Sequence, residues 1–194
     1  MKLQKLRQLV KAQYEQNDPN QADWAEYLYP NHVLLVAQKS EQLCQQYGGD
    51  ADIAVAGALL HDIADSIMGR DDSAHKEKSY EIGRNLCAQA GYSKDEISVI
   101  IDDISTKHSC RDNVAPDSLE GRIVSTADAW AHMNSDFYLF AFSQVKSAQE
   151  FMERKTWMAE HLTKDFDKKM FFKDIKEELY PMHRSLLQIT NTSD

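Results

Sequence analysis

The chain has 194 residues, with 31 acidic against 22 basic side chains and a formal net charge of −9. This balance excludes a nucleic-acid polymer as the main partner, because binding a phosphate backbone depends on clustered Lys and Arg side chains. Hydrophobic residues make up 42% of the chain, but no run reaches the roughly 18 apolar residues that a membrane-spanning helix needs.

The predicted elements are all helical. Apolar residues recur at helical spacing, and there are only four prolines and seven glycines, which favours an all-α fold. We expect a single domain over residues 1–194, built as a bundle of roughly eight to ten helices. In chain order, the expected helices are one that ends before Asn17, a short piece at 24–28 that ends at Tyr29 and Pro30, then 32–47, 52–64, 74–90, 94–107 and 119–133, one or two from residue 136, and a charged segment over 150–187 broken at Tyr180 and Pro181.

Cysteine content favours a reducing compartment. The three cysteines, Cys44, Cys87 and Cys110, are odd in number and lack a Cys-x-x-Cys spacing, so we expect free thiols. The first residues lack the apolar stretch and cleavage site of a signal peptide. We therefore expect a cytoplasmic protein.

A histidine and a carboxylate stand side by side near the end of the most apolar helix. Residues 53–60 read Ile-Ala-Val-Ala-Gly-Ala-Leu-Leu, apolar on every side, and His61 and Asp62 follow. An ionised carboxylate in such a place is costly without an opposite charge, and a divalent cation would offset that cost and also use the imidazole. The alternative is a helix end that emerges into solvent, with His61 favoured by the helix dipole.

Two further candidate ligands occur in similar apolar settings. His32 opens the helix 32–47, and Asp128 lies within the helix 119–133. Taken singly, each has an ordinary alternative, a helix cap for His32 and a solvated helix face for Asp128. Together with His61 and Asp62 they offer two imidazoles and two carboxylates, which suit an octahedral Mn, Fe, Co, Ni or Mg ion. Water positions left open on such an ion are typical of a catalytic site.

The order of these residues resembles the pattern H…HD…D of the HD-domain metal-dependent phosphohydrolases. The resemblance covers about residues 30–132, and its longest stretches are "AGALLHDIAD" and "LEGRIVSTADA". It implies a small, single-domain HD protein of the bacterial type, with an HD core over about 30–132, an N-terminal helix over 1–28 and C-terminal helices over 136–190. It also implies that His32, His61, Asp62 and Asp128 bind a metal.

The resemblance extends to two more histidines. The stretches "HKEKSYEIGRNL" and "IIDDISTKHS" resemble segments of many members, which implies metal-ligand roles for His75 and His108. Asp62 would then bridge two ions, one held by His32, His61 and Asp128 and the other by His75 and His108. Some members keep one ion and four ligands, so the sequence leaves open one or two divalent ions. The ordinary alternatives are a charged surface turn for His75 and a helix end for His108.

The resemblance implies hydrolysis of a phosphate ester or anhydride of a small, nucleotide-like molecule by a metal-activated water. Asp62 would orient that water, and Lys107 or Arg122, with Arg111 as a further candidate, would neutralise phosphate charge in the transition state. Two alternatives stay open, an HD-type diiron oxygenase and a non-catalytic HD module that senses a ligand. A homodimer is also left open.

The chain also departs from the pattern. Many signalling members carry a Lys shortly after the HD pair, where this chain has Asp65. His132 follows Asp128 by four residues, shares its helix face and is a candidate contact behind the ligands. We expect His161 and His183, which lie outside the resembling region, at the surface.

Overall fold

A computed structural model describes residues 1–190, and every regular element in that range is helical. It contains ten α-helices, three π-helical segments and two 3₁₀ turns, which confirms the predicted all-α fold. The α-helices are α1 (Lys2–Tyr14), α2 (Ala25–Leu28), α3 (Leu34–Tyr47), α4 (Ala51–Leu60), α5 (His75–Ala90), α6 (Lys94–Ser98), α7 (Leu119–Met133), α8 (Phe137–Ser143), α9 (Ala148–Lys164) and α10 (Lys173–Thr190). The π-helical segments are η1 (Tyr29–Val33), η3 (Val99–Ser105) and η5 (Asp165–Lys169), and the 3₁₀ turns are η2 (Ile63–Ser66) and η4 (Arg111–Asn113).

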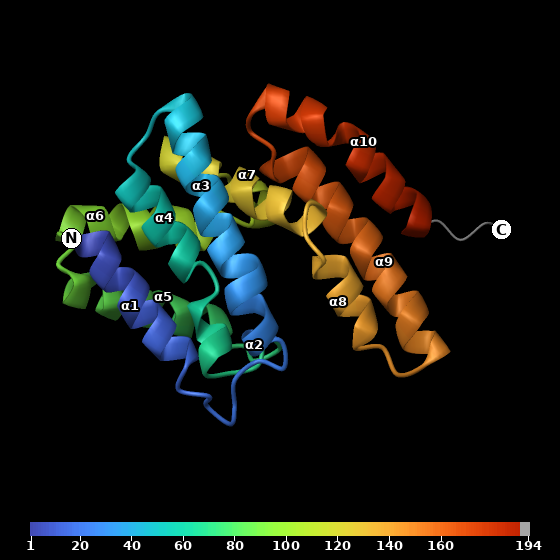
Figure 1. Cartoon of the computed structure of the whole chain (residues 1–194), viewed down its shortest axis with the longest axis horizontal. Helices are drawn as coiled ribbons and strands as arrows, with labels where there is room; N and C mark the ends of the chain where they lie inside the picture. Colours follow the sequence, from blue (N-terminus) through green and yellow to red (C-terminus); the bar gives the residue numbers. More distant parts are fainter. Residues whose placement is uncertain (191–194) are drawn as a thin grey trace.

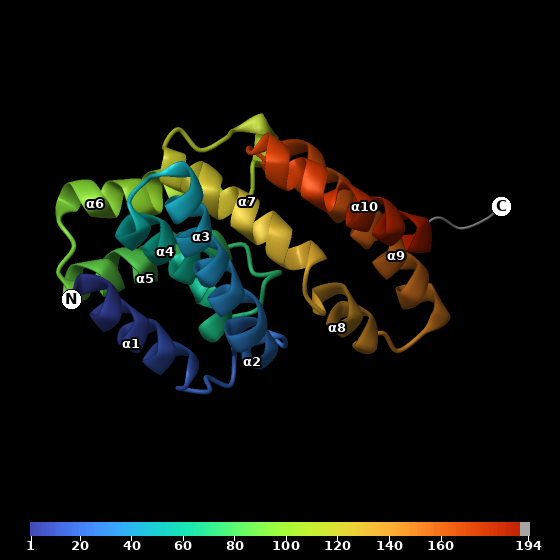
Figure 2. The same ribbon diagram turned by 45° about the horizontal axis from the view of Figure 1, so that its top comes forward.

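Helices α3, α4 and α7 form the centre of the bundle. α3 packs against both α4 and α7, and α1 packs against α4 and α5. Figure 1 shows α1 to α6 on one side and α8 to α10 on the other, with α7 between them. In Figure 2, α7 runs from the region of α6 to the start of α8, and α10 lies along α9. α7 is therefore the element that connects the two groups of helices.

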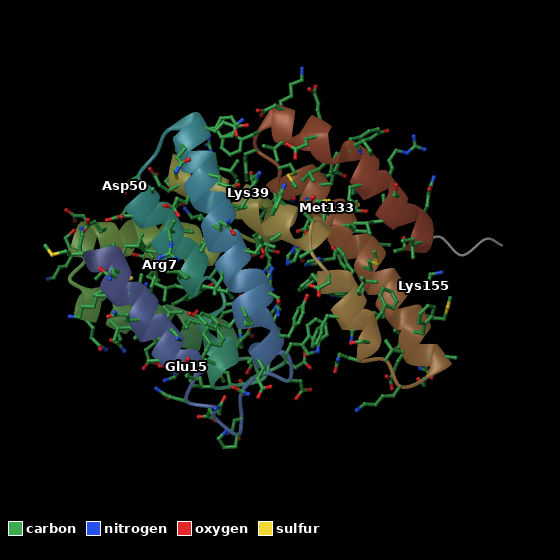
Figure 3. All side chains as sticks on the ribbon, in the orientation of Figure 1. Arg7, Glu15, Lys39, Asp50, Met133 and Lys155 are labelled. Carbon is green, nitrogen blue, oxygen red and sulfur yellow. The ribbon has the colours of Figure 1, made fainter. Side chains whose placement is uncertain are left out.

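The most buried helix is α4. Every side chain from Ile53 to Leu60 is buried, and Asp50 caps the first turn by accepting hydrogen bonds from the backbone N–H groups of Asp52 and Ile53. Figure 3 marks Asp50 at the turn that precedes this helix. Because the whole helix is in the core, His61, which follows it, is buried, and Asp62 lies at the border of the core with its side chain partly exposed.

The helix predicted over residues 52–64 ends earlier than expected. α4 stops at Leu60, and Asp62 has a non-helical backbone with φ −131° and ψ 34°. His61 Nδ1 donates to the carbonyl oxygen of Ala58 at 2.7 Å, so a side chain satisfies one of the last carbonyls of the helix. The polypeptide can then turn sharply into η2.

Two helix breaks predicted at proline are wrong. The chain stays helical from Ala25 to Tyr47, and Pro30 lies in the π-helical turn η1, where the wider turn changes the hydrogen-bond pattern around a residue that has no N–H. α10 likewise continues through Pro181. Pro181 and Glu177, four residues earlier, are both exposed, so water can bond the carbonyl that the proline leaves unpaired.

The core is continuous across the bundle. A single cluster of buried apolar side chains extends from Leu6 in α1 to Leu179 in α10. The three cysteines are buried free thiols, as predicted. Within residues 1–190, none of the helices has both the length and the apolar character needed to cross a bilayer.

Candidate metal centre

Asp128 of α7 lies among three buried imidazoles. Its Oδ1 is 3.1 Å from Nε2 of His32, 3.4 Å from Nε2 of His132 and 4.0 Å from Nε2 of His61. Asp62 Oδ2 lies 3.7 Å from the same His61 nitrogen. Figure 3 labels Met133, which follows His132 at the end of α7, where the chain passes to the C-terminal helices. The structure thus brings together the four residues of the predicted H…HD…D set and adds His132.

The unpaired atoms of this group fit a cation. His61 Nδ1 donates to Ala58, so its Nε2 carries a lone pair, and this nitrogen and Asp128 Oδ1 are buried without a hydrogen-bond partner in the described chain. A buried acceptor nitrogen beside two carboxylates is costly unless a cation lies among them. The separations of 3.1 to 4.0 Å also match ligands of one ion, which stand roughly 3 to 4 Å apart when each bond is about 2.1 Å.

His108 and His132 are oriented in the same way as His61. His108 Nδ1 donates to the carbonyl oxygen of Ser105 at 3.0 Å, and His132 Nδ1 donates to Asp165 Oδ2 at 2.7 Å. Such a contact at the second ring nitrogen is typical of metal-binding histidines. The ligand atoms of His61, Asp62 and His108 lie within 4.8 Å of one another, as do those of His32, Asp128 and His132.

Burial keeps two of these imidazoles neutral. Desolvation lowers the pKa of His32 to about 4 and the pKa of His108 to about 4, because an apolar surrounding disfavours the charged ring. A neutral imidazole is the form that binds a metal ion. Both side chains are therefore ready to bind at pH 7.

All three π-helical segments border this group. η1 contains His32, η3 ends three residues before His108, and η5 begins with Asp165 and ends with Lys169. A π turn holds one residue more than an α turn, which changes the direction of the side chains on either side of it, and such turns are frequent at functional sites.

The comparison with known protein families agrees with this geometry. Residues 29–133 match the family model of the HD domain, which is more than half of the 194-residue chain. The chain belongs to the HD domain family. Members of this family are generally metal-dependent hydrolases that bind divalent metals. No curated protein and no solved structure matches the chain.

Two residues from outside the HD domain match lie directly behind Asp128. The ammonium group of Lys169, only 1% exposed, pairs with Asp128 Oδ2 and lies 3.0 Å from Asp165 Oδ1. Burial by itself would raise the pKa of Asp128, but Lys169, His132 and His32 together outweigh burial and hold this pKa well below its usual range. No sequence signal pointed to Asp165 and Lys169, because an Asp and a Lys four residues apart are typical of an exposed ion pair on a helix surface.

His75 contacts Asp65 instead of the other predicted ligands. Its Nε2 is 2.9 Å from Asp65 Oδ1. Arg70 Nη2 donates to Asp65 Oδ2 and, at 2.8 Å, to Asp62 Oδ2. Among residues 1–190, His75 joins none of the close groups of ligand atoms. The structure therefore brings His108, but not His75, next to the HD pair.

Two cavities meet at the HD pair, one of about 680 Å³ and one of about 620 Å³. Asp128, His132 and Lys169 line the larger cavity, and His61 and His75 line the smaller one. The side chains that line both cavities are Asp62, Arg70, Asp72, His108, Ser109 and Arg111. Asp62 therefore faces solvent-accessible space on both sides.

The two basic residues predicted as catalytic are placed less favourably. Lys107 lines the smaller cavity, but its ammonium is bonded to Asp103 at 3.0 Å and to Asp117. Arg122 lines neither cavity, and its Nε donates to the carbonyl oxygen of Pro116 at 3.3 Å. Arg122 and Asp128 are both on α7, at a spacing that places them on different faces of the helix. Arg70 and Arg111, in contrast, reach both cavities.

The surface positions predicted for His161 and His183 are wrong. His161 is half-buried, with Nδ1 3.5 Å from Asp165 Oδ2. His183 is buried and stacks on Phe166, with ring centroids 4.0 Å apart. Both histidines turn inward because α9 and α10 pack against each other and α10 also packs against α7.

Proposed function

We propose that this HD domain protein uses a bound divalent metal to hydrolyse a phosphate ester or anhydride of a small, nucleotide-like molecule. The observation that carries the proposal is the group of unpaired acceptor atoms around Asp128 Oδ1, beside a cavity that cationic side chains also line. Membership of the HD family supports hydrolysis. The cationic side chains that line the larger cavity support a phosphorylated small molecule as the substrate.

The proposed ligands are His32, His61, Asp62 and Asp128, with His132 as a further imidazole. Three imidazoles favour Mn, Fe, Co or Ni over Mg, which prefers oxygen ligands. When bound, such an ion would polarise a phosphoryl oxygen and lower the pKa of an attacking water.

Asp62 is proposed to orient the attacking water. Its side chain is 26% exposed and lines both cavities. Burial by itself would raise the pKa of Asp62, but Arg70, His61 and His108 together outweigh burial and hold the pKa well below its usual range. The side chain is therefore a carboxylate at neutral pH, and its oxygens can accept a hydrogen bond from the water.

Arg70 and Arg111 are proposed to bind the phosphate, in place of Lys107 and Arg122. Both arginines line the two cavities. Arg70 uses a single nitrogen, Nη2, for its bonds to Asp62 and Asp65, so its other N–H groups can donate to a ligand. Guanidinium groups held beside the phosphate would stabilise the charge that develops in the transition state.

The nucleotide-like character is inferred from three aromatic side chains that line the larger cavity, Trp24, Phe137 and Trp157. The guanidinium of Arg154 lies 5.2 Å from the ring centroids of both Trp24 and Trp157. Aromatic faces and an arginine are the groups on which nucleobases stack. A cavity of about 680 Å³ also has the size of a small-molecule site.

A substrate screen tests the proposed function. The protein is loaded with Mn, Fe, Co, Ni or Mg and assayed for release of phosphate or pyrophosphate from nucleotides and simple phosphomonoesters. We expect activity that chelation removes and metal restores, and Asp62→Asn to lower kcat by about 10²-fold or more. Asp102→Asn removes an exposed carboxylate that pairs with Arg84 and should leave kcat unchanged.

Three results would point elsewhere. A metal-loaded protein that is inactive on the whole panel would contradict the proposed hydrolysis. Two irons per chain with O₂ consumption would favour a diiron oxygenase. Nucleotide binding without turnover, with full binding by Asp62→Asn, would favour a ligand-sensing module.

A further inference from the structure

Arg70 forms ion pairs with Asp62 of the HD pair and with Asp65. Its Nη2 is 2.8 Å from Asp62 Oδ2 and also donates to Asp65 Oδ2. Asp65 is fully buried, and its other oxygen is 2.9 Å from His75 Nε2. Asp62, Arg70, Asp65 and His75 therefore form one continuous chain of contacts.

A dinuclear centre would need the same atoms for a second ion. In the two-ion arrangement that the resemblance implies, Asp62 would be shared by both ions and His75 would bind the second one. Here Asp62 Oδ2 already accepts a hydrogen bond from Arg70, and Nε2 of His75 is already in contact with the carboxylate of Asp65. We propose that the guanidinium of Arg70 replaces a second metal ion, so that the centre holds one divalent ion per chain. This inference rests on the metal centre proposed above.

The charges of the ion-paired groups agree with a single ion. Four carboxylates, Asp62, Asp65, Asp128 and Asp165, are paired with two side-chain cations, Arg70 and Lys169. This leaves two negative charges, which one divalent cation balances. A second divalent ion would create a positive excess next to a guanidinium group, and like charges so close together repel strongly in a partly buried site.

The same contacts give a role to Asp65, the acid that stands where many relatives carry a base. Asp65 is in the 3₁₀ turn η2, and its backbone oxygen accepts a hydrogen bond from the N–H of Ala22 at 2.8 Å. This bond anchors the backbone of Asp65, and His75 contacts one carboxylate oxygen, so the other oxygen can fix the guanidinium of Arg70 against Asp62. Asp65 is therefore a positioning residue for Arg70, and a centre with one ion would not support a diiron reaction, which needs two irons.

Counting bound Mn²⁺ tests the inference. The full chain, freed of metal by chelation, is titrated with Mn²⁺ by calorimetry and by electron paramagnetic resonance, which distinguishes an isolated ion from a coupled pair. We expect one Mn²⁺ per wild-type chain with the signal of an isolated ion. Arg70→Met frees Asp62 and Asp65 for a metal and should bind two. Arg84→Met, the same change in an exposed pair with Asp102, should still bind one.

The remaining outcomes would contradict either the single-ion inference or the proposed function. Two Mn²⁺ ions in the wild type, or one in both the wild type and Arg70→Met, would overturn the inference. A wild-type chain that binds no Mn²⁺ would instead contradict the proposed function. If Arg70→Met does not fold, His75→Ala supplies the test. It should keep one Mn²⁺ with affinity within about twofold, whereas loss of an ion or a loss of 10-fold or more, as expected for a true ligand contact, would overturn the inference.

Discussion

Two histidines of the metal centre, His61 and His108, share a local cause for their orientation. His61 and His108 each donate from Nδ1 to the carbonyl oxygen three residues earlier, at the end of a helix, and His132 donates to Asp165. The carbonyls of a last helical turn have no backbone donor, so an imidazole at that place satisfies one of them. The opposite nitrogen, Nε2, is then left as the lone-pair atom that faces the site.

Asp103 provides a pH prediction at the scale of one residue. It accepts hydrogen bonds from the backbone N–H groups of Asp117 and Ser118, both at 2.9 Å. Burial raises the pKa of Asp103, but the Ser118 hydroxyl, these two backbone donors and Lys107 together outweigh burial and lower the pKa from 3.8 to about 2. Because the folded-state pKa is depressed, the carboxylate stabilises the fold above about pH 4, and this stabilisation is lost as the pH falls through about 2.

We therefore expect Asp103→Ala to reduce the free energy of unfolding by about 1 to 3 kcal/mol at pH 7. The difference in the free energy of unfolding between this variant and the wild type should become smaller as the pH falls from 4 to 2. Urea unfolding at pH 7, 4 and 2.5 measures this difference. Asp167→Ala, which removes an exposed carboxylate 3.9 Å from Lys176, should cost less than about 1 kcal/mol. A cost for Asp103→Ala that does not change with pH would contradict the explanation.

At the scale of elements, two glycines allow η3 to pack closely on its neighbours. A Cβ atom on Gly57 of α4 would lie 2.6 Å from Ile104 Cγ2, and one on Gly83 of α5 would lie 2.6 Å from Ile101 Cδ1. Both isoleucines are fully buried. η3 leads directly to His108, so this close packing helps to place that imidazole next to the HD pair.

Gly57→Ala is therefore expected to destabilise the protein although Ala is the better helix former. The added methyl group would force Ile104 to move, and such overpacking costs about 1 to 3 kcal/mol, more than the gain of about 1 kcal/mol from helix propensity. Gly69→Ala is the matched control, because nothing lies within 4 Å of a Cβ atom there. Urea unfolding at pH 7 compares the two variants, and equal stability would show that the helices are not in tight contact at Gly57.

At the scale of the whole molecule, the HD-matched helices and the C-terminal helices meet along α7. Thr126 Oγ1 donates to the carbonyl oxygen of Lys169 at 3.0 Å and accepts from the N–H of Phe171 at 3.1 Å. Lys169 then reaches Asp128 with its side chain. A residue from beyond the HD domain match therefore contacts a proposed metal ligand directly.

Lys169→Met should destabilise the whole fold, because it leaves Asp128 and Asp165 as buried carboxylates without their cation. Loss of one partner from a buried ion pair costs about 3 to 5 kcal/mol. Bound Mn²⁺ should recover more stability in this variant than in the wild type, since it supplies positive charge at Asp128. Thermal unfolding with and without Mn²⁺ measures both effects. Lys168→Met, which removes an exposed lysine bonded to Asn113, should behave like the wild type, and equal behaviour of the two variants would contradict this account.

Local signals predicted the all-α fold and most of the helices, and the resemblance to the HD pattern joined the first four candidate ligands into one set. The apolar run before His61 and Asp62 predicts a core helix, and the spacing of Ile123 and Val124 before Asp128 predicts a second inward-facing helix. Such signals depend on neighbours within one or two turns, so a single sequence contains them. Prolines were less informative, because Pro30 and Pro181 lie in helices that continue past them.

The amino-acid order alone determined the helical periodicity, the apolar helix that precedes His61 and the pattern H…HD…D. Each of these depends on residues that are close in the chain or on their order along it. Only the tertiary structure decided which charges meet. Lys169 lies 41 residues from Asp128, and Arg70 pairs with Asp62 and Asp65 across a loop. Arg122, although on the same helix as Asp128, points elsewhere. Ion pairs of this kind depend on how packed helices and loops bring distant side chains within about 3 Å, and no local periodicity encodes that distance.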